Sequence, residues 1–185
     1  MLNLTVSYPL ITYGGVLINA IVIIAESSPA GPSRQLFLMV MNHKHTRPAR
    51  IVLAEDDRAI AHLIEIAMKR TGIPHDLETV HDGHQAIDAL EKKSAVGYRT
   101  PDLLLLDLHM PGKNGFEVLQ YVKGHSRLQR IPVVMFSNSS LADDVTKAYE
   151  LHVNAFVQKN TDFADLCRTA DTILRFWLQT AILPF

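Results

Sequence analysis

Short apolar runs alternate with amphipathic segments along the chain from Arg50 onward. Leu103–Leu106 and Ile131–Phe136 are apolar throughout, a pattern typical of strands that are buried on both faces of a sheet. Three further runs have the length and the flanking turn residues of strands: Arg50–Ala54, Asp76–Val80 and Ala155–Gln158. We therefore expect five strands in this part of the chain.

Apolar residues recur at helical spacing between these strands, which predicts a helix after each one. The expected helices are a segment from Ile60 that Gly72 closes, Gln85–Lys92, Phe116–Lys123, Leu141–Leu151 and Phe163–Trp177. Five strand–helix units in about 135 residues predict an α/β fold. The expected architecture is a doubly wound five-stranded parallel sheet with helices on both faces.

Composition narrows the class of protein. The 185 residues carry a formal net charge of -1, which argues against a general binder of nucleic acid or anionic membranes. The single cysteine, Cys167, excludes an internal disulfide and fits a reducing compartment. Cys167 falls on the apolar stripe of the last helix, where we expect an inert core position. The Trp177 end of the same helix fits either core packing or a dimer surface.

The first 49 residues differ from the remainder, so we divide the chain into an extension (1–49) and a second domain (50–185). Met1–Ala25 has no charged residue, and residues 1–49 carry net +2 whereas the rest carries -3. The favoured interpretation of residues 1–40 is upstream sequence translated from a misassigned start codon, since Met39 and Met41 shortly precede the first strand. The alternatives are a membrane anchor, because Leu4–Ala25 is long enough to span a bilayer as a helix, and a soluble extension.

Polar side chains follow four of the expected strands directly. They are Glu55, Asp56 and Asp57 after the first strand, Asp107 after the third, Ser137 after the fourth and Lys159 after the fifth. Because the carboxyl ends of parallel strands meet at one edge of a sheet, we expect these groups to lie together. Clustered carboxylates repel one another unless a cation neutralises them, and Mg²⁺ prefers such oxygen ligands. The pattern predicts a Mg²⁺ site beside a hydroxyl and an ammonium that suit an added anion.

The segment Leu105–Gly115, with the sequence LLDLHMPGKNG, resembles the phosphoacceptor segment of response-regulator receiver domains of the CheY-like superfamily. The acidic pair Glu55-Asp56, the hydroxyl of Ser137, the lysine Lys159 and the switch aromatic Phe156 match the same family. The resemblance extends over about Arg50–Pro184 and implies a flavodoxin-like sheet with strand order 2-1-3-4-5. Within the family, Tyr149–Asn154 and Phe176–Thr180 are similar to small single-domain response regulators that partner phytochrome-type histidine kinases.

The resemblance implies a role for each site residue. Asp107 would accept a phosphoryl group from a sensor histidine kinase, and Ser137 and Lys159 would bind that group. The implied ligands of Mg²⁺ are Glu55, Asp56, Asp107 and the backbone carbonyl of His109, with Asp57 as a further candidate acid. Ser137 and Phe156 would form the conformational switch.

The resemblance also implies how such a protein works. We expect a cytoplasmic signalling protein that acts by protein–protein contact, homodimer formation included, and that binds no nucleic acid. It is not expected to be an enzyme beyond slow hydrolysis of its own phosphoryl group. A membrane would be involved only through Leu4–Ala25.

Two positions depart from the family pattern, and two other functions stay open. Asn160 stands where the family usually has a proline, and Asn138 stands where it usually has a small residue that leaves the phosphoryl group accessible. A phosphatase of the haloacid dehalogenase type would also use a strand-end aspartate, but it needs an acid where this chain has His109. The other alternative is a receiver-shaped scaffold that is never phosphorylated.

The spacing of two histidine pairs is compatible with metal binding, but neither pair has further ligands nearby in the sequence. The pairs are His43/His45 and His81/His84. We therefore favour surface roles for these four side chains.

Overall fold

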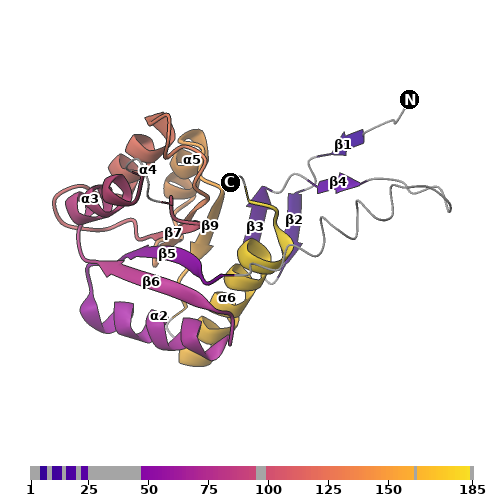
Figure 1. Ribbon diagram of the computed structural model, residues 1–185, viewed down its shortest axis with the longest axis horizontal. Coiled ribbons are helices and arrows are strands. Elements are labelled where there is room, and N and C mark those ends of the chain that lie inside the picture. Colours follow the sequence, from indigo (N-terminus) through magenta and orange to yellow (C-terminus); the bar gives the residue numbers. More distant parts are fainter. Residues whose placement is uncertain are drawn as a thin grey trace.

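The computed structural model describes residues 5–7, 10–13, 16–19, 22–24, 47–94, 99–160 and 162–183. Its centre is a parallel sheet between two layers of helices (Figure 1). The five parallel strands are β5 (Ala49–Ala54), β6 (His75–Val80), β7 (Leu103–Leu106), β8 (Val133–Ser137) and β9 (Ala155–Gln158). They lie in the order β6-β5-β7-β8-β9, so the predicted doubly wound order 2-1-3-4-5 is confirmed.

The helices alternate with these strands, as predicted. They are α2 (Arg58–Arg70), α3 (Gly83–Ser94), α4 (Gly115–Gly124), α5 (Ala142–Glu150) and α6 (Phe163–Arg175), which continues as a π-helical turn, η1 (Phe176–Thr180). Helices α2 and α6 cover one face of the sheet, and α3, α4 and α5 cover the other (Figure 1). The expected start of the fourth helix is corrected, because Leu141 has extended backbone angles and only caps α5.

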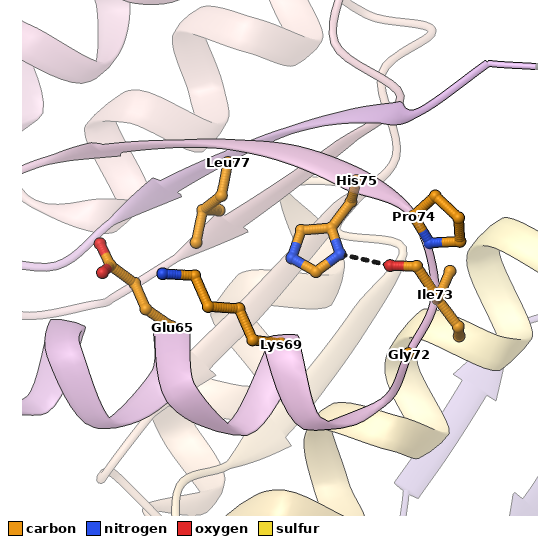
Figure 2. Close-up of a pocket in the computed structure, with 7 residues that line it drawn as sticks. All are labelled: Glu65, Lys69, Gly72, Ile73, Pro74, His75 and Leu77. Atoms are coloured by element: carbon orange, nitrogen blue, oxygen red, sulfur yellow. Dashed lines mark hydrogen bonds between the residues drawn. The ribbon is translucent and has the colours of Figure 1, made fainter.

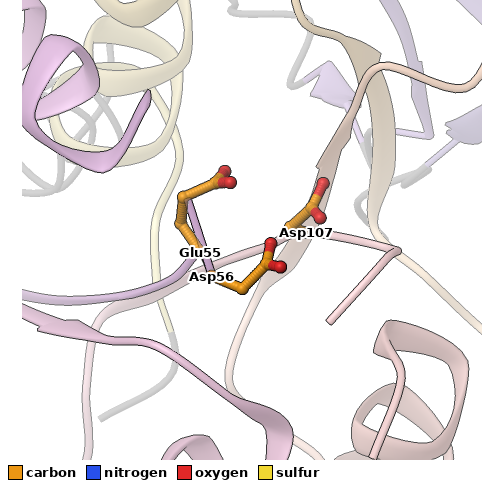
Figure 3. Close-up of side chains that lie close together, drawn as sticks. All are labelled: Glu55, Asp56 and Asp107. Carbon is orange, nitrogen blue, oxygen red and sulfur yellow. The ribbon is translucent and has the colours of Figure 1, made fainter. Parts of the chain in front are cut away.

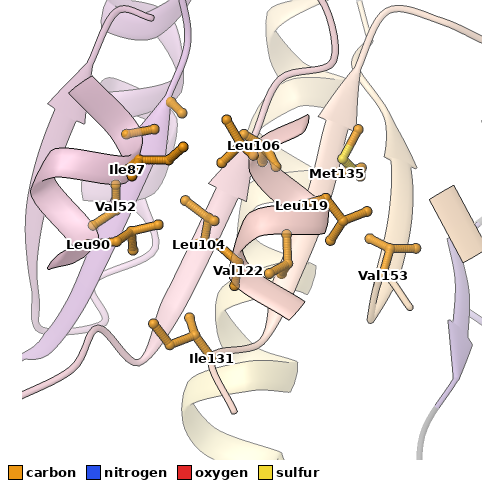
Figure 4. Close-up of a cluster of buried hydrophobic side chains, with 14 of the residues drawn as sticks. Val52, Ile87, Leu90, Leu104, Leu106, Leu119, Val122, Ile131, Met135 and Val153 are labelled. Atoms are coloured by element: carbon orange, nitrogen blue, oxygen red, sulfur yellow. The ribbon is translucent and has the colours of Figure 1, made fainter. Parts of the chain in front are cut away.

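Strand β7 shows how one apolar run holds both layers together. Leu103 and Leu105 belong to the core cluster under α2 and α6, whereas Leu104 and Leu106 belong to the cluster under α3, α4 and α5. All four side chains are at most 2% exposed, as expected for a central strand whose alternate residues face opposite helix layers. In the cluster under α3, α4 and α5, Leu104 and Leu106 face apolar residues of α3 and α4, such as Leu90 (Figure 4).

Four short strands lie within the first 24 residues: β1 (Thr5–Ser7), β2 (Leu10–Tyr13), β3 (Val16–Asn19) and β4 (Val22–Ile24). Strand β3 pairs antiparallel with the edge strand β9, and β2 pairs with β3, so the sheet gains two strands that the sequence pattern did not predict. The described part of Leu4–Ala25 is therefore strand, not the helix that a membrane anchor would need. Within the residues that the structure describes, no helix is long and apolar enough to span a bilayer.

Candidate functional site

Three carboxylates meet where β5 and β7 end (Figure 3). Glu55 follows β5 directly and Asp107 follows β7, and the register of the two strands brings them together because Ala54 pairs with Leu106. One oxygen each of Glu55, Asp56 and Asp107 can be chosen so that all three lie within 4.8 Å of one another. Glu55 and Asp107 are buried, whereas Asp56 is exposed. The predicted acidic cluster is thus formed, with one side open to solvent.

Lys159 is the positive charge of the cluster. It follows β9, and its backbone N–H donates to the carbonyl oxygen of Ser137 at 2.8 Å, which fixes the loop after β9 beside the end of β8. Its buried ammonium donates to Asp107 Oδ1 at 2.7 Å and also to a carboxylate oxygen of Glu55. One ammonium therefore faces two buried carboxylates.

The electrostatics of the cluster favour a cation. Burial raises the pKa of Glu55, and the nearby charge of Asp107 raises it further, although Lys159 lowers it. Buried carboxylates that outnumber their counter-charge are destabilised as anions, and a hard divalent ion with oxygen ligands relieves this. The donor set of Glu55, Asp56 and Asp107 fits Mg²⁺. The side chains of His81 and His84 lie outside this cluster, and His43 and His45 lie outside the described residues.

Asp57 has a different task from the three clustered acids. It is the N-cap of α2, and its Oδ1 accepts from the backbone N–H groups of Ala59 and Ile60 at 2.8 and 3.1 Å. Such a cap contributes about 1 kcal/mol to a helix. Asp57 is not brought into the acidic cluster, so its role as an additional acid stays a prediction without support from this geometry.

The loop that follows Asp107 is pressed against the site. The backbone N–H of His109 donates to Asp107 Oδ2 at 3.0 Å, which orients the carboxylate. Gly115 starts α4, and a Cβ at this position would lie 2.3 Å from the carbonyl oxygen of Asp107, so only glycine fits. The two oxygens of Asp107 are thus held by different groups, Oδ1 by Lys159 and Oδ2 by His109.

Ser137 ends β8 with a fully buried side chain. Its Oγ accepts from the backbone N–H of Ser139 at 3.2 Å, and the hydroxyl of Ser139 in turn donates to Asp144 in the first turn of α5. This second pair was not predicted from the sequence, although a serine shortly before an acid in the first turn of a helix is a recognisable local signal. Asn138, between the two serines, is exposed at the rim of the site.

Phe156 and Asn160 flank the site on β9 and in the loop after it. Phe156 is 8% exposed and packs into the cluster under α3, α4 and α5, so its ring already points inward in this structure. Asn160 follows Lys159 without a cis peptide bond, and no such bond occurs elsewhere among the described residues. The Asn160 amide donates to Thr169 Oγ1 of α6 at 3.4 Å.

Trp177 is half-buried, packs against the cluster under α2 and α6 and makes an edge contact with Phe176.

A separate pocket of about 420 Å³ opens between α2 and the edge strand β6 (Figure 2). Its lining includes Glu65, Lys69 and His75. Two of these groups have partners within the fold, because His75 Nδ1 donates to the carbonyl oxygen of Ile73 at 2.7 Å and Glu65 accepts from Thr79 Oγ1. This pocket does not include the acidic cluster, and we assign no chemistry to it.

Known proteins resemble the chain over most of its length. It is 38% identical to the response regulator Rcp1 of Synechocystis sp. (strain ATCC 27184 / PCC 6803 / Kazusa) over 145 residues, which is 78% of this chain and 99% of Rcp1. It is 40% identical over 131 residues to the probable methanogenesis regulatory protein FilR2 of Methanothrix harundinacea (strain 6Ac), which is 71% of this chain and 84% of FilR2.

Solved structures agree with these relatives. The phosphorylated cyanobacterial phytochrome response regulator RcpA superposes with a TM-score of 0.69 and 41% identity, over 75% of this chain and 99% of RcpA. The Mn²⁺-bound form of Rcp1 superposes with a TM-score of 0.68 and 39% identity, over 75% of this chain and all of Rcp1. Residues 51–171, which contain every group of the acidic cluster, match the response regulator receiver domain, and the chain belongs to that family.

Proposed function

We propose that this receiver accepts a phosphoryl group from a sensor histidine kinase on Asp107 and signals through the resulting change in its surface. The observation that carries the proposal is the position of Asp107, a buried carboxylate between Lys159 and two further acids at the carboxyl edge of the sheet. The family match supports the same reading. No feature of the site favours a phosphatase, since the residue two positions after Asp107 is the exposed His109 and not an acid.

The proposed reaction forms a bond between an Asp107 oxygen and phosphorus while the bond from phosphorus to the imidazole nitrogen of the kinase histidine breaks. The Lys159 ammonium then balances charge that Asp107 gains as an acyl phosphate. Ser137 Oγ only accepts in its bond from the Ser139 N–H, so its own hydrogen is left for a phosphoryl oxygen. Hydrolysis of the acyl phosphate returns the carboxylate, and we expect no other turnover.

Glu55, Asp56, Asp107 and the backbone carbonyl of His109 are the groups that would hold Mg²⁺. When bound, the ion supplies positive charge that offsets the charge of the transferring phosphoryl group. Bound Mg²⁺ would also offset part of the burial penalty that raises the pKa of Glu55. The relative Rcp1 has been crystallised with Mn²⁺, a cation of the same oxygen-binding class, which supports this cofactor.

The proposed switch links Asp107 to the surface around α5 and β9. A phosphoryl group that draws the Ser137 hydroxyl toward it would pull on Ser139 and, through it, on Asp144 in α5. Phe156 lies on the adjacent strand and would follow the shift of this loop. The output is a contact with another protein in the cytoplasm, a second copy of the chain included, without nucleic acid.

The proposed partner is a phytochrome-type histidine kinase. Two relatives support this partner, and the similarity to this chain extends over nearly the whole length of each. RcpA is a phytochrome response regulator, and Rcp1 shares the same fold. Incubation with a purified phytochrome-type kinase that carries ³²P on its histidine is expected to move the label to this chain within minutes. A histidine kinase of an unrelated class serves as control, and equal transfer from both kinases would contradict the assignment.

Phosphorylation itself is tested with acetyl phosphate and Mg²⁺, followed by intact mass. We expect the gain of one phosphoryl group in the wild-type chain and none in Asp107→Asn. Asp88→Asn, which removes an exposed carboxylate of α3, is the matched control and should behave like the wild type. Absence of any gain with both small-molecule and kinase donors would favour the scaffold that is never phosphorylated.

A further inference from the structure

His81 is a half-buried histidine just after β6 that contacts the acidic cluster without being one of its acids. Its Nδ1 lies 2.9 Å from the backbone carbonyl oxygen of Glu55. Because a carbonyl oxygen only accepts, the imidazole donates through Nδ1. One of the four histidines for which the sequence favoured a surface role therefore joins the site, as a hydrogen-bond donor to the backbone of a proposed ligand.

This hydrogen bond extends the ladder between β5 and β6 by one step. Val80 pairs with Ala54, and the backbone N–H of Glu55 donates to the carbonyl oxygen of Val80 at 3.0 Å. The His81 imidazole then takes the place at which a longer parallel ladder would use a backbone N–H. Glu55 is only 2% exposed, so its carbonyl oxygen depends on a partner from within the protein.

The bond holds the peptide unit that connects two of the proposed ligands, Glu55 and Asp56. The carboxylates of Glu55 and Asp107 are both held directly, because each accepts from the ammonium of Lys159. The Asp56 carboxylate is exposed, and it makes no hydrogen bond or ion pair with any other residue in the described part of the chain. Its direction therefore depends on the backbone from which it projects, and His81 fixes the preceding carbonyl.

The junction that carries His81 is tightly packed. A Cβ at Gly83 would lie 2.0 Å from the carbonyl oxygen of Lys113, and a Cβ at Gly112 would lie 2.7 Å from Nδ1 of His84. The two glycines thus let the start of α3 pack directly on the loop between β7 and α4. His81 donates from a fixed base that contacts both loops in which the clustered acids lie.

We propose that His81 is a positioning residue for Mg²⁺, whose Nδ1–H holds the Glu55 carbonyl and so keeps the Asp56 carboxylate turned toward Asp107. The inference rests on the proposed Mg²⁺ site. Loss of a partner that orients a metal ligand typically weakens metal binding by about 10- to 100-fold. Mg²⁺ demands nearly ideal octahedral geometry, whereas Ca²⁺ accepts variable geometry, so displacement of one ligand should weaken Mg²⁺ binding more than Ca²⁺ binding.

The test measures the binding of Mg²⁺ alone and of Ca²⁺ alone to the full chain by calorimetry. His81→Leu and His81→Ala remove the donor, and both should weaken Mg²⁺ binding by about tenfold or more but Ca²⁺ binding by less than about threefold. His81→Asn places an N–H donor near the position of Nδ1 and should restore Mg²⁺ binding to within about threefold of the wild type. Equal losses for the two cations, or no recovery in His81→Asn, would overturn the proposal.

His75→Leu is the matched control. His75 is also half-buried, and its Nδ1 also donates to a backbone carbonyl oxygen, that of Ile73, at 2.7 Å, but it lies at the opposite end of β6. The control should bind both cations like the wild type. A loss of Mg²⁺ affinity in His75→Leu as large as that in His81→Leu would show a general effect on the strand and would contradict the proposal. Near-UV circular dichroism from Trp177 checks that each variant is folded.

A rate measurement separates this role from the proposed function. With acetyl phosphate as donor, His81→Leu should need about tenfold more Mg²⁺ for half of its maximal phosphorylation rate and should reach the wild-type rate at saturation. A wild-type chain that binds no Mg²⁺ would overturn the proposed function and this inference together. Normal binding by the wild type with unchanged binding by folded His81→Leu would overturn the inference alone.

Discussion

Glu55 is the residue at which the proposed function and stability oppose each other. Its folded pKa is raised above the ordinary value of 4.5, so the folded chain binds a proton more tightly than the unfolded chain. Stability from this group is therefore present below pH 4.5 and is lost as pH rises through the raised folded pKa. At neutral pH and without Mg²⁺, the ionised side chain destabilises the fold.

Glu55→Gln should therefore increase the free energy of unfolding at pH 7 in EDTA, because it removes a buried charge that Lys159 only partly offsets. Urea denaturation from pH 4 to 8 checks this, and the gain should shrink toward the acid end. The same variant should bind Mg²⁺ about tenfold more weakly or worse by calorimetry, since it loses one anionic ligand. Unchanged Mg²⁺ affinity would remove Glu55 from the proposed ligand set.

Asn138 is exposed beside the buried Ser137, at the rim of the site. We expect Asn138→Ala to shorten the lifetime of phospho-Asp107 by about two- to fivefold, because water would reach the phosphoryl group more easily. Release of ³²P from the phosphorylated chain is the measurement. Ser140→Ala, which changes an exposed residue farther along the same loop, is the control. Equal release rates for Asn138→Ala and the wild type would show that the side chain does not shield the phosphate.

His152 is the one residue other than glycine with a positive φ, 63°, in the described part of the chain. It ends the turn after α5, where the left-handed conformation costs a side chain about 1 kcal/mol relative to glycine. His152→Gly should accordingly raise the free energy of unfolding by about 0.5–1 kcal/mol in urea. Glu150→Gly, at the helical end of α5, should instead lower it by about 1 kcal/mol.

At the scale of elements, the apolar pattern was sufficient to predict all five parallel strands and the helices between them. Strand β7 is the clearest case, since four consecutive leucines can be buried only between two helix layers. Polar contacts across the fold were not predictable in this way. The side chains of Lys123 and Asn154 form a hydrogen bond although they are 31 residues apart, and neither stands in a periodic pattern that indicates a partner. Such pairs follow from the packed fold and not from local sequence.

The start of α4 depends on a capping box that was not predicted from the sequence. Asn114 accepts from the backbone N–H of Glu117 at 3.1 Å, and the Glu117 carboxylate accepts from the backbone N–H of Asn114 at 2.9 Å. Asn114→Ala should lower the free energy of unfolding by about 1 kcal/mol, and Gln120→Ala on the exposed face of α4 should change it little. Equal effects of the two substitutions in urea denaturation would argue against a stabilising cap.

For the whole molecule, the groups of the candidate site could be predicted because strand ends of a parallel sheet converge on one edge. Each site residue falls where its strand stops, and the four come from different strands: Glu55, Asp107, Ser137 and Lys159.

The pairing of β3 with β9 could not be predicted in the same way. Strand β3 is apolar from Val16 to Ile18, so no alternation of polar and apolar positions within it specifies which face or which neighbour it would take. The edge of β9, in contrast, offers unpaired backbone groups to any strand that approaches.

The division of the chain at residue 49 leads to a prediction for the intact molecule. Pairing of β3 with β9 involves two residue pairs, Leu17 with Phe156 and Ile18 with Ala155. The backbone hydrogen bonds of so short a ladder contribute about 1–3 kcal/mol. A chain that begins at residue 47 should therefore fold, lose no more than about 3 kcal/mol in urea denaturation and still gain one phosphoryl group from acetyl phosphate and Mg²⁺. Phe156 lies in this short ladder, so the truncated chain separates two roles of β3. A loss of stability with an unchanged phosphate lifetime would mean that β3 only covers the edge of β9. A changed lifetime of phospho-Asp107 would mean that β3 also restrains the switch residue Phe156. Failure of the truncated chain to fold would show that the first 46 residues belong to the receiver itself, contrary to the division.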